Sequence, residues 1–341
     1  MNYFDIEAIS NSSLAYIDPL SGGNPRLFRK FLDGKLPSID SKAFEIGTLI
    51  HAELLEPGTV DVVEENIPTP KVREVLDAMW LRLYGTVPLD EELPIIELEE
   101  IDPMTLTTCI TDDFYPKWKG ETRRAKIIKE GASYWHALYL NRGKTMLDPA
   151  DYHVVTGAVE SLKLHPTAVN MLEGNFEDNY EEAVSELELT WTETWAVFGT
   201  EEVVELPMKS KLDRVLFNHT KKTMALVDLK TTRTPIGKFG DTIFKYNYHR
   251  QLAFYQLALK RAYPDYTFVD SYITVVQTNK EYPVECFHIE EDLLELGWDL
   301  MCSLVDRVAY HTHLGNWGNS METLLGGIIN VSLEGADYGD E

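Results

Sequence analysis

Cysteine is scarce in this sequence, and the cysteines present are isolated. Only three occur among the 341 residues, Cys109, Cys286 and Cys302, and none has CxxC spacing. This argues against a disulfide framework and against a zinc site built from paired cysteines. It also argues against an iron–sulfur cluster held by four thiolates. Isolated thiols suit a reducing compartment, so the sequence predicts a cytoplasmic protein.

Long apolar runs and nucleotide-binding loops are also missing. No apolar stretch reaches the roughly 18–20 residues that a membrane-spanning helix needs. The first residues, MNYFDIEAISNSSL, have neither the basic start nor the apolar centre of a secretory signal. There is no P-loop and no GxGxxG loop. We therefore expect no membrane association and no ATP-driven activity.

Positive charge is in short supply. The chain has 31 lysines and arginines against 56 acids, a formal net charge of −25. A nucleic-acid-binding protein usually carries a basic footprint, so such a function requires a local one. The segment 117–129 provides a local basic footprint, because its six basic residues face only one acid, Glu121. The alternative interpretation is a solvated helix face with no role in binding. The bases of this segment are Lys117, Lys119, Arg123, Arg124, Lys126 and Lys129.

The segment 206–255 contains the strongest local pattern. Two runs rich in strand-forming residues, KLDRVLF and TMALVDLKTT, flank the polar segment 218–222 and predict a β-hairpin. If the turn centres on Thr220 and Lys221, antiparallel pairing sets Asp213 opposite Asp228. Their Cβ atoms would then lie about 4.5–5.5 Å apart.

Two carboxylates placed this way repel each other unless a cation lies between them. Asp228 and Lys230 share one face of their strand, while Val227 and Leu229 are expected to enter the core. The group is typical of a Mg²⁺ site with a positioned ammonium. Glu186 or Glu188, on the expected preceding strand, could also reach this group, although a solvated strand face is the favoured interpretation for both.

Two further patterns lie on expected helices. Gln251 and Tyr255 are four residues apart, so both project from one helix face. His51 lies beside the apolar face of a helix over residues 38–57. By position alone, His51 is more typical of a core histidine than of a metal ligand.

Together these residues resemble the PD-(D/E)XK nuclease superfamily, in its RecB-like branch. The matching elements occur in order: the GxxxH run from Gly47 to His51, then Asp213, then Asp228-Leu229-Lys230, then Gln251 with Tyr255. The segments GKTMLDPADYHVV and LKLHPTAVNML, with Tyr248 and His249 before Gln251, resemble phage and prophage exonucleases of the exodeoxyribonuclease VIII (RecE-like) type. The segment 58–115 and the C-terminal tail depart from that pattern.

The resemblance implies a fold and a domain organisation. We expect an α/β, restriction-endonuclease-like core with a mixed central sheet flanked by helices. A mainly helical region would cover residues 1–172, the nuclease core 173–325 and an acidic, glycine-containing tail 326–341, together forming one compact catalytic unit.

The resemblance also implies an activity, which we expect to be Mg²⁺-dependent exonuclease action on linear double-stranded DNA in phage-type recombination, with Mn²⁺ as a substitute. It further implies a single-strand annealing protein as partner and a ring-shaped homo-oligomer. The alternatives are a catalytically silent DNA- or partner-binding protein, or a nuclease acting on single strands or RNA.

The roles that the resemblance implies are as follows. Metal ligands would be His51, Asp213, Asp228 and the backbone carbonyl of Leu229. Lys230 would orient or activate the attacking water, and Gln251 and Tyr255 would position the lysine or the scissile phosphate. Nucleic acid would contact Lys117, Lys119, Arg123, Arg124, Tyr248 and His249.

Overall fold

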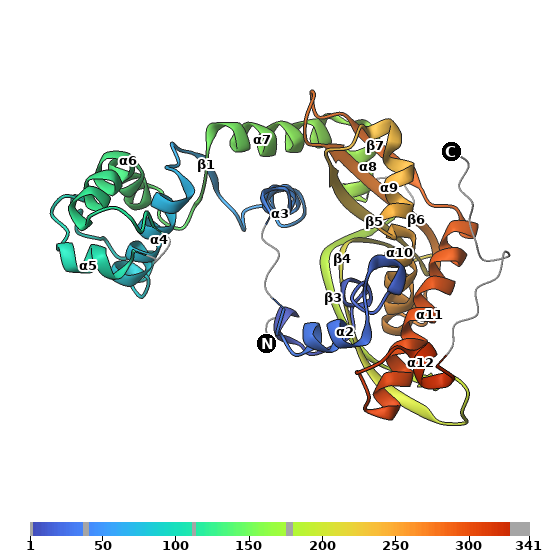
Figure 1. The fold of residues 1–341 in the computed structure, drawn as a ribbon. Coiled ribbons are helices and arrows are strands. Elements are labelled where there is room, and N and C mark those ends of the chain that lie inside the picture. The colour runs from blue at the N-terminus through green and yellow to red at the C-terminus, as the bar shows by residue number, and fades with distance from the viewer. Residues whose placement is uncertain (1–2, 37–40, 111–113, 175–179, 328–341) are drawn as a thin grey trace, which may run out of the picture. The chain divides into compact units, whose positions relative to one another are not determined.

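The computed structural model describes residues 3–36, 41–110, 114–174 and 180–327. It divides the chain into two compact units, one made of residues 1–41 and 161–341 and the other of residues 42–160. Figure 1 shows the fold of each unit. The expected boundary at residue 172 is therefore not where the structure divides. Most of the expected tail, from residue 328 onward, lies outside the described residues.

A five-stranded sheet forms the centre of the first unit, in the order β3-β4-β5-β6-β7. The pairing is antiparallel except between β5 and β6, which are parallel, so the sheet is mixed as expected. The strands are β3 (Glu182–Ala196), β4 (Val203–Asn218), β5 (Thr223–Thr232), β6 (Thr267–Gln277) and β7 (Val284–His288).

The predicted hairpin is the β4–β5 pair. Its register runs from Arg214 opposite Val227 to Asn218 opposite Thr223, which centres the turn on Thr220 and Lys221. The Asn218 side chain accepts a hydrogen bond from the Lys221 N–H at 2.7 Å, a local bond typical of turn asparagines. The turn residues thus fix the register that brings Asp213 beside Asp228.

One face of the sheet is covered by helices from the later part of the chain. The β5–β6 crossover contains α9 (Phe239–Lys245) and α10 (Tyr248–Ala262), and α11 (Glu291–Leu314) packs on α10 (Figure 1). Their apolar side chains join Met224 and Leu226 of β5 in the main core. Gly297 permits the close helix contact, since a Cβ there would lie 2.2 Å from the His249 carbonyl oxygen.

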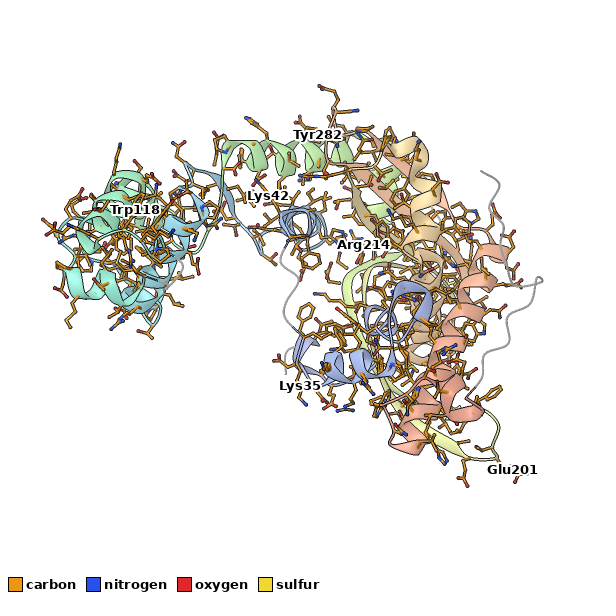
Figure 2. The ribbon with its side chains drawn as sticks, viewed as in Figure 1. Lys35, Lys42, Trp118, Glu201, Arg214 and Tyr282 are labelled. Carbon is orange, nitrogen blue, oxygen red and sulfur yellow. The ribbon has the colours of Figure 1, made fainter. Side chains whose placement is uncertain are left out.

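The opposite face of the sheet is covered as well. The last turn of α8 (Pro166–Glu173) contacts it, with Met171 Sδ 3.9 Å from the hydroxyl of Thr274. Arg214 of β4, labelled in Figure 2, donates to the Leu172 carbonyl of the same helix. Because both faces are covered, Asp228 is as fully buried as Val227 and Leu229. The expectation that only the apolar neighbours enter the core was wrong.

The N-terminal segment belongs to this unit. It contains α1 (Asn11–Leu14), capped by Ser10, and α2 (Pro25–Leu32), capped by Asn24. Ile9 pairs with Met208 at the edge of β4. Arg250 of α10 donates to the side chain of Asn11 at 3.0 Å. These contacts fasten the segment to the elements that carry the candidate site. The short helix α12 (Met321–Leu325) ends the described chain.

The second unit is mainly helical and has its own core. Val72, Leu76 and Met79 of one helix pack against Ile127 and Trp135 of another, so the segment 58–115 contributes to a packed domain. Arg124 donates to the Glu99 carbonyl at 2.9 Å, and Trp118 (Figure 2) stacks on Tyr115 at 4.4 Å. The elements are α3 (Lys42–Leu55), β1 (Val62–Glu64), α4 (Pro70–Tyr84), α5 (Pro103–Thr108), α6 (Gly120–Leu140), β2 (Thr145–Leu147) and most of α7 (Pro149–Leu164), whose last residues belong to the first unit.

None of the described helices has the length and apolar content needed to cross a membrane.

Candidate active site

Two carboxylates meet where the β4–β5 ladder ends. The last paired residues are Arg214 and Val227, and Asp213 and Asp228 come next on their strands. At this point the Asp213 side chain replaces a backbone acceptor: its Oδ2 accepts a hydrogen bond from the Leu229 N–H at 2.8 Å. Burial raises the pKa of Asp213, and Lys230, the Leu229 N–H and Asp228 offset only part of that rise.

Lys230 lies against this pair. Its Nζ is 2.5 Å from Asp228 Oδ2, and the two side chains are 15% and 1% exposed. Burial alone would lower the pKa of Lys230, but Asp228 and Asp213 outweigh it and the pKa is raised. The ammonium also lies over the Tyr248 ring, 5.1 Å from its centre. Asp213, Asp228 and Lys230 therefore form one charged cluster, in which Asp228 is buried and the other two are half-buried.

Helix α10 faces this cluster. Asn247 precedes the helix with a left-handed backbone, φ 55°, which asparagine tolerates better than most residues. Gln251 Nε2 donates to the Tyr255 hydroxyl at 2.8 Å, so the expected pair on one helix face is in contact. Burial, Asp228 and Asp213 together raise the pKa of Tyr255 well above its ordinary value. The Tyr255 hydroxyl therefore lies within the field of both acids.

Glu186 joins the cluster from β3. A Glu186 carboxylate oxygen and one of Asp213 lie within 4.8 Å of each other. Lys211 pairs with Glu186 at 2.9 Å and reaches Glu188 only at 3.7 Å. The alternation of β3 gives Glu186 and Glu188 the same face, so the sequence alone could not separate them.

His51 lies half-buried on α3 in the second unit, next to the fully buried Ile50. Its part in the site remains a prediction.

The scan against protein families decides the classification. Residues 139–324 match the family model of the PD-(D/E)XK nuclease superfamily, which is more than half of the chain. The chain belongs to the PD-(D/E)XK nuclease superfamily. Asp213 and Asp228-Leu229-Lys230 lie inside the matched range, and the mixed sheet with helices on both faces is the restriction-endonuclease-like fold expected for this superfamily. Both the superfamily and the fold predicted from the sequence are confirmed.

Two other comparisons add little to this. A crystal structure of a "Putative exonuclease" from Eubacterium rectale is similar to this chain with a TM-score of 0.48 and 11% sequence identity, covering 96% of this chain and 91% of that one. No curated protein matches the sequence.

The donor set of this PD-(D/E)XK nuclease suits the divalent metal that such enzymes use. Asp213, Asp228 and Glu186 offer carboxylate oxygens, the hard ligands that Mg²⁺ and Mn²⁺ prefer. Asp213 and Glu186 already lie within 4.8 Å of each other. The residues present therefore fit a hard divalent cation.

The residues predicted to contact nucleic acid differ in how far their side chains are exposed and already hydrogen-bonded within the protein. Lys117 and Lys119 are exposed just before α6. Arg123 donates to the carbonyls of Tyr115 and Pro116 at 3.1 and 2.9 Å. Arg124 donates to the Glu99 carbonyl. The two arginines thus stabilise the second unit itself.

The two residues of α10 predicted to contact nucleic acid, Tyr248 and His249, also differ in their surroundings. Tyr248 lies against Lys230 in the charged cluster. His249 is only 4% exposed and packs against Phe244, so its side chain offers no surface.

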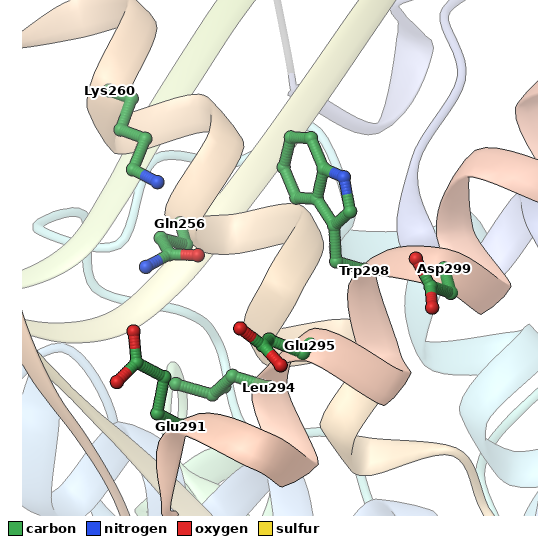
Figure 3. A pocket seen from close by; sticks show the side chains of 7 residues that line it. All are labelled: Gln256, Lys260, Glu291, Leu294, Glu295, Trp298 and Asp299. Atoms are coloured by element: carbon green, nitrogen blue, oxygen red, sulfur yellow. The ribbon is translucent and has the colours of Figure 1, made fainter.

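A cleft of about 460 Å³ between α10 and α11 shares no residue with the charged cluster. Figure 3 shows its lining, with Gln256 and Lys260 on α10 facing Glu291, Glu295 and Trp298 on α11. Its carboxylates would repel phosphate, which disfavours this cleft as a nucleic-acid site.

Proposed function

We propose that the protein is a metal-dependent deoxyribonuclease that hydrolyses phosphodiester bonds from the ends of linear double-stranded DNA. The observation that supports this best is the convergence of Asp213, Asp228 and Lys230 at the end of the β4–β5 ladder, inside the matched nuclease range. A half-buried lysine paired with a buried carboxylate is costly to maintain for stability alone. Its placement is explained by a site that handles an anionic substrate.

Each residue of the cluster has a distinct role in this proposal. Asp213 and Asp228 would hold Mg²⁺, with Mn²⁺ as a substitute, and the resemblance adds the Leu229 carbonyl and His51 to the ligand set. When bound, the metal lowers the pKa of water and offsets charge on the phosphate. Lys230 directs its ammonium to the attacking water and to the phosphate oxygens, where negative charge develops during hydrolysis.

Gln251 and Tyr255 serve as positioning residues. Their hydrogen bond of 2.8 Å fixes the Tyr255 hydroxyl beside the two acids. From there the pair orients Lys230 or the scissile phosphate. A fixed geometry of this kind lowers the entropic part of the barrier.

The RecE-like resemblance supports the biological context that we propose. The enzyme would act in phage-type recombination, leaving single strands for an annealing protein, and would assemble as a ring-shaped homo-oligomer. Exposed Lys117 and Lys119 are the candidate phosphate contacts.

The decisive experiment uses end-labelled linear duplex DNA with Mg²⁺ or with EDTA, beside circular duplex, single-stranded DNA and RNA. We expect degradation of linear duplex DNA with Mg²⁺, none with EDTA and none of the circle. Asp228→Asn should nearly abolish cleavage while leaving the circular dichroism spectrum unchanged. Near-normal cleavage by that variant would refute the proposal.

A further inference from the structure

Glu186 has an unusual backbone conformation in the middle of a strand. Its φ is 49°, in the left-handed region that residues other than glycine seldom adopt. The β3–β4 ladder is regular on both sides, with Ser185 opposite Arg214 and Leu187 opposite Leu212, and it is interrupted where Glu186 faces Asp213. The interruption therefore coincides with a residue of the charged cluster.

The side chain of Glu186 is turned inward, whereas that of Glu188 is not. Glu186 is 16% exposed and Glu188 is 50% exposed, although they are neighbours on the same strand face. A Glu186 carboxylate oxygen lies within 4.8 Å of one of Asp213, and Lys211 compensates its charge at 2.9 Å. Glu186 thus shares the surroundings of the two hairpin acids.

We infer that Glu186 is a further carboxylate ligand for the divalent metal of this site, and that Lys211 competes with the metal for it. The inference rests on the proposed function, because it adds a residue to the same site. Oxygen ligands from several carboxylates are the usual coordination of Mg²⁺ and Mn²⁺ in proteins. A strand residue held in a left-handed conformation costs about 1–3 kcal/mol, and such costs cluster at ligand sites.

Competition with Lys211 gives the two residues opposite effects on metal affinity. A metal that takes the Glu186 carboxylate must displace the ammonium that pairs with it. Removing Glu186 deletes a ligand and should weaken metal binding. Removing Lys211 deletes the competitor and should strengthen it. A purely structural role for the pair would predict the same direction for both substitutions.

The test is isothermal titration of the full chain with MnCl₂ in the absence of DNA. We expect Glu186→Gln to weaken Mn²⁺ binding by about 10-fold or more, the size of effect seen when groups that support a metal are removed. Lys211→Met should strengthen it. Glu188→Gln is the matched control and should stay within about 2-fold. Glu186→Asn, a residue that tolerates the left-handed backbone, should weaken binding like Glu186→Gln, which separates ligand loss from misfolding.

Two outcomes separate this inference from the proposed function. If Asp228→Asn abolishes Mn²⁺ binding and cleavage while Glu186→Gln behaves like Glu188→Gln, the Glu186 inference alone fails. If Asp228→Asn leaves both unchanged, the proposed function fails. Thermal unfolding of each variant in EDTA verifies that the fold is retained.

Discussion

Asp228 is a buried carboxylate that pairs with the ammonium of Lys230. A buried pair of this kind adds little net stability, but breaking it leaves one charge uncompensated. Lys230→Met should therefore lower the free energy of unfolding in EDTA by about 3–5 kcal/mol. Adding Asp228→Asn should recover much of that loss without restoring cleavage. Denaturant unfolding of both variants measures this, and an unchanged stability for Lys230→Met would contradict it.

The relative positions of the hairpin acids and Lys230 could be predicted, because periodicity and turn chemistry determine the spacing of residues on two paired strands. Two features of the cluster could not be predicted from the sequence. The burial of Asp228 depends on α10 and α8 covering both faces of the sheet, which distant segments decide. The inward turn of Glu186 depends on one backbone angle, φ 49°, that alternation does not encode.

At the scale of elements, a clamp of hydrogen bonds to the Glu193 carboxylate joins the end of α10 to β3. Arg261 donates two hydrogen bonds to Glu193, at 2.9 and 2.6 Å, and Trp191 Nε1 donates a third at 3.1 Å. The Arg261 bond in particular holds the pKa of Glu193 below its usual range. The clamp fixes the helix that carries Gln251 and Tyr255.

Glu193→Gln should lower stability at pH 7 by about 1–2 kcal/mol, since Arg261 is half exposed and part of its interaction is screened. Because the folded pKa is lowered, this contribution is complete above the ordinary glutamate pKa and is lost as the pH falls through the folded value. The difference between the variant and the parent should therefore shrink in acid. Thermal unfolding across pH measures this, with exposed Glu201→Gln as the control.

The contact between α10 and α11 depends on Gly297. An alanine Cβ would lie 2.2 Å from the backbone oxygen of His249, so the helices must move apart. Gly297→Ala should cost about 2–3 kcal/mol of stability and should also slow cleavage, because α10 carries Gln251 and Tyr255. Gly240→Ala is the control: nothing lies within 4 Å of a Cβ there. Equal stability of the two variants would rule the prediction out.

Elements whose ends carry strong signals were predicted well. The run over residues 267–277 is rich in β-branched and aromatic residues and predicts a strand, and Asp148-Pro149 predicts the start of a helix that runs to Leu164; both elements have these bounds in the structure. Asp148 explains the second case, since its side chain accepts from the Asp151 N–H at 2.9 Å and starts the helix. The sequence also predicts a helix over residues 120–130, but that helix continues to Leu140, because Tyr134 and Trp135 pack into a core that periodicity did not reveal.

At the scale of the whole molecule, the charge of −25 requires a local basic surface for DNA. Lys117→Gln with Lys119→Gln should weaken duplex binding and reduce the slope of log affinity against log salt by about 2, one for each lysine that no longer pairs with a phosphate. The arginines are left intact because they hold backbone carbonyls. Exposed Lys163→Gln is the control, and an unchanged slope in the double variant would exclude this surface.

The fold class was predictable for the whole molecule because the strand and helix order is characteristic, but the division into units was not. The segment 1–41 belongs with residues 161–341. Its attachment depends on long-range contacts such as Ile9 with Met208 and Arg250 with Asn11. Such contacts leave no periodic signal in the sequence.

The hydrogen bond from the Leu229 N–H to Asp213 links one main-chain amide directly to a carboxylate that we propose as a metal ligand. That amide is therefore a built-in spectroscopic reporter. Its nitrogen and proton resonances should move when diamagnetic Mg²⁺ draws electron density from Asp213, whereas paramagnetic Mn²⁺ should broaden them. Occupancy could thus be followed at a single nucleus, without substrate.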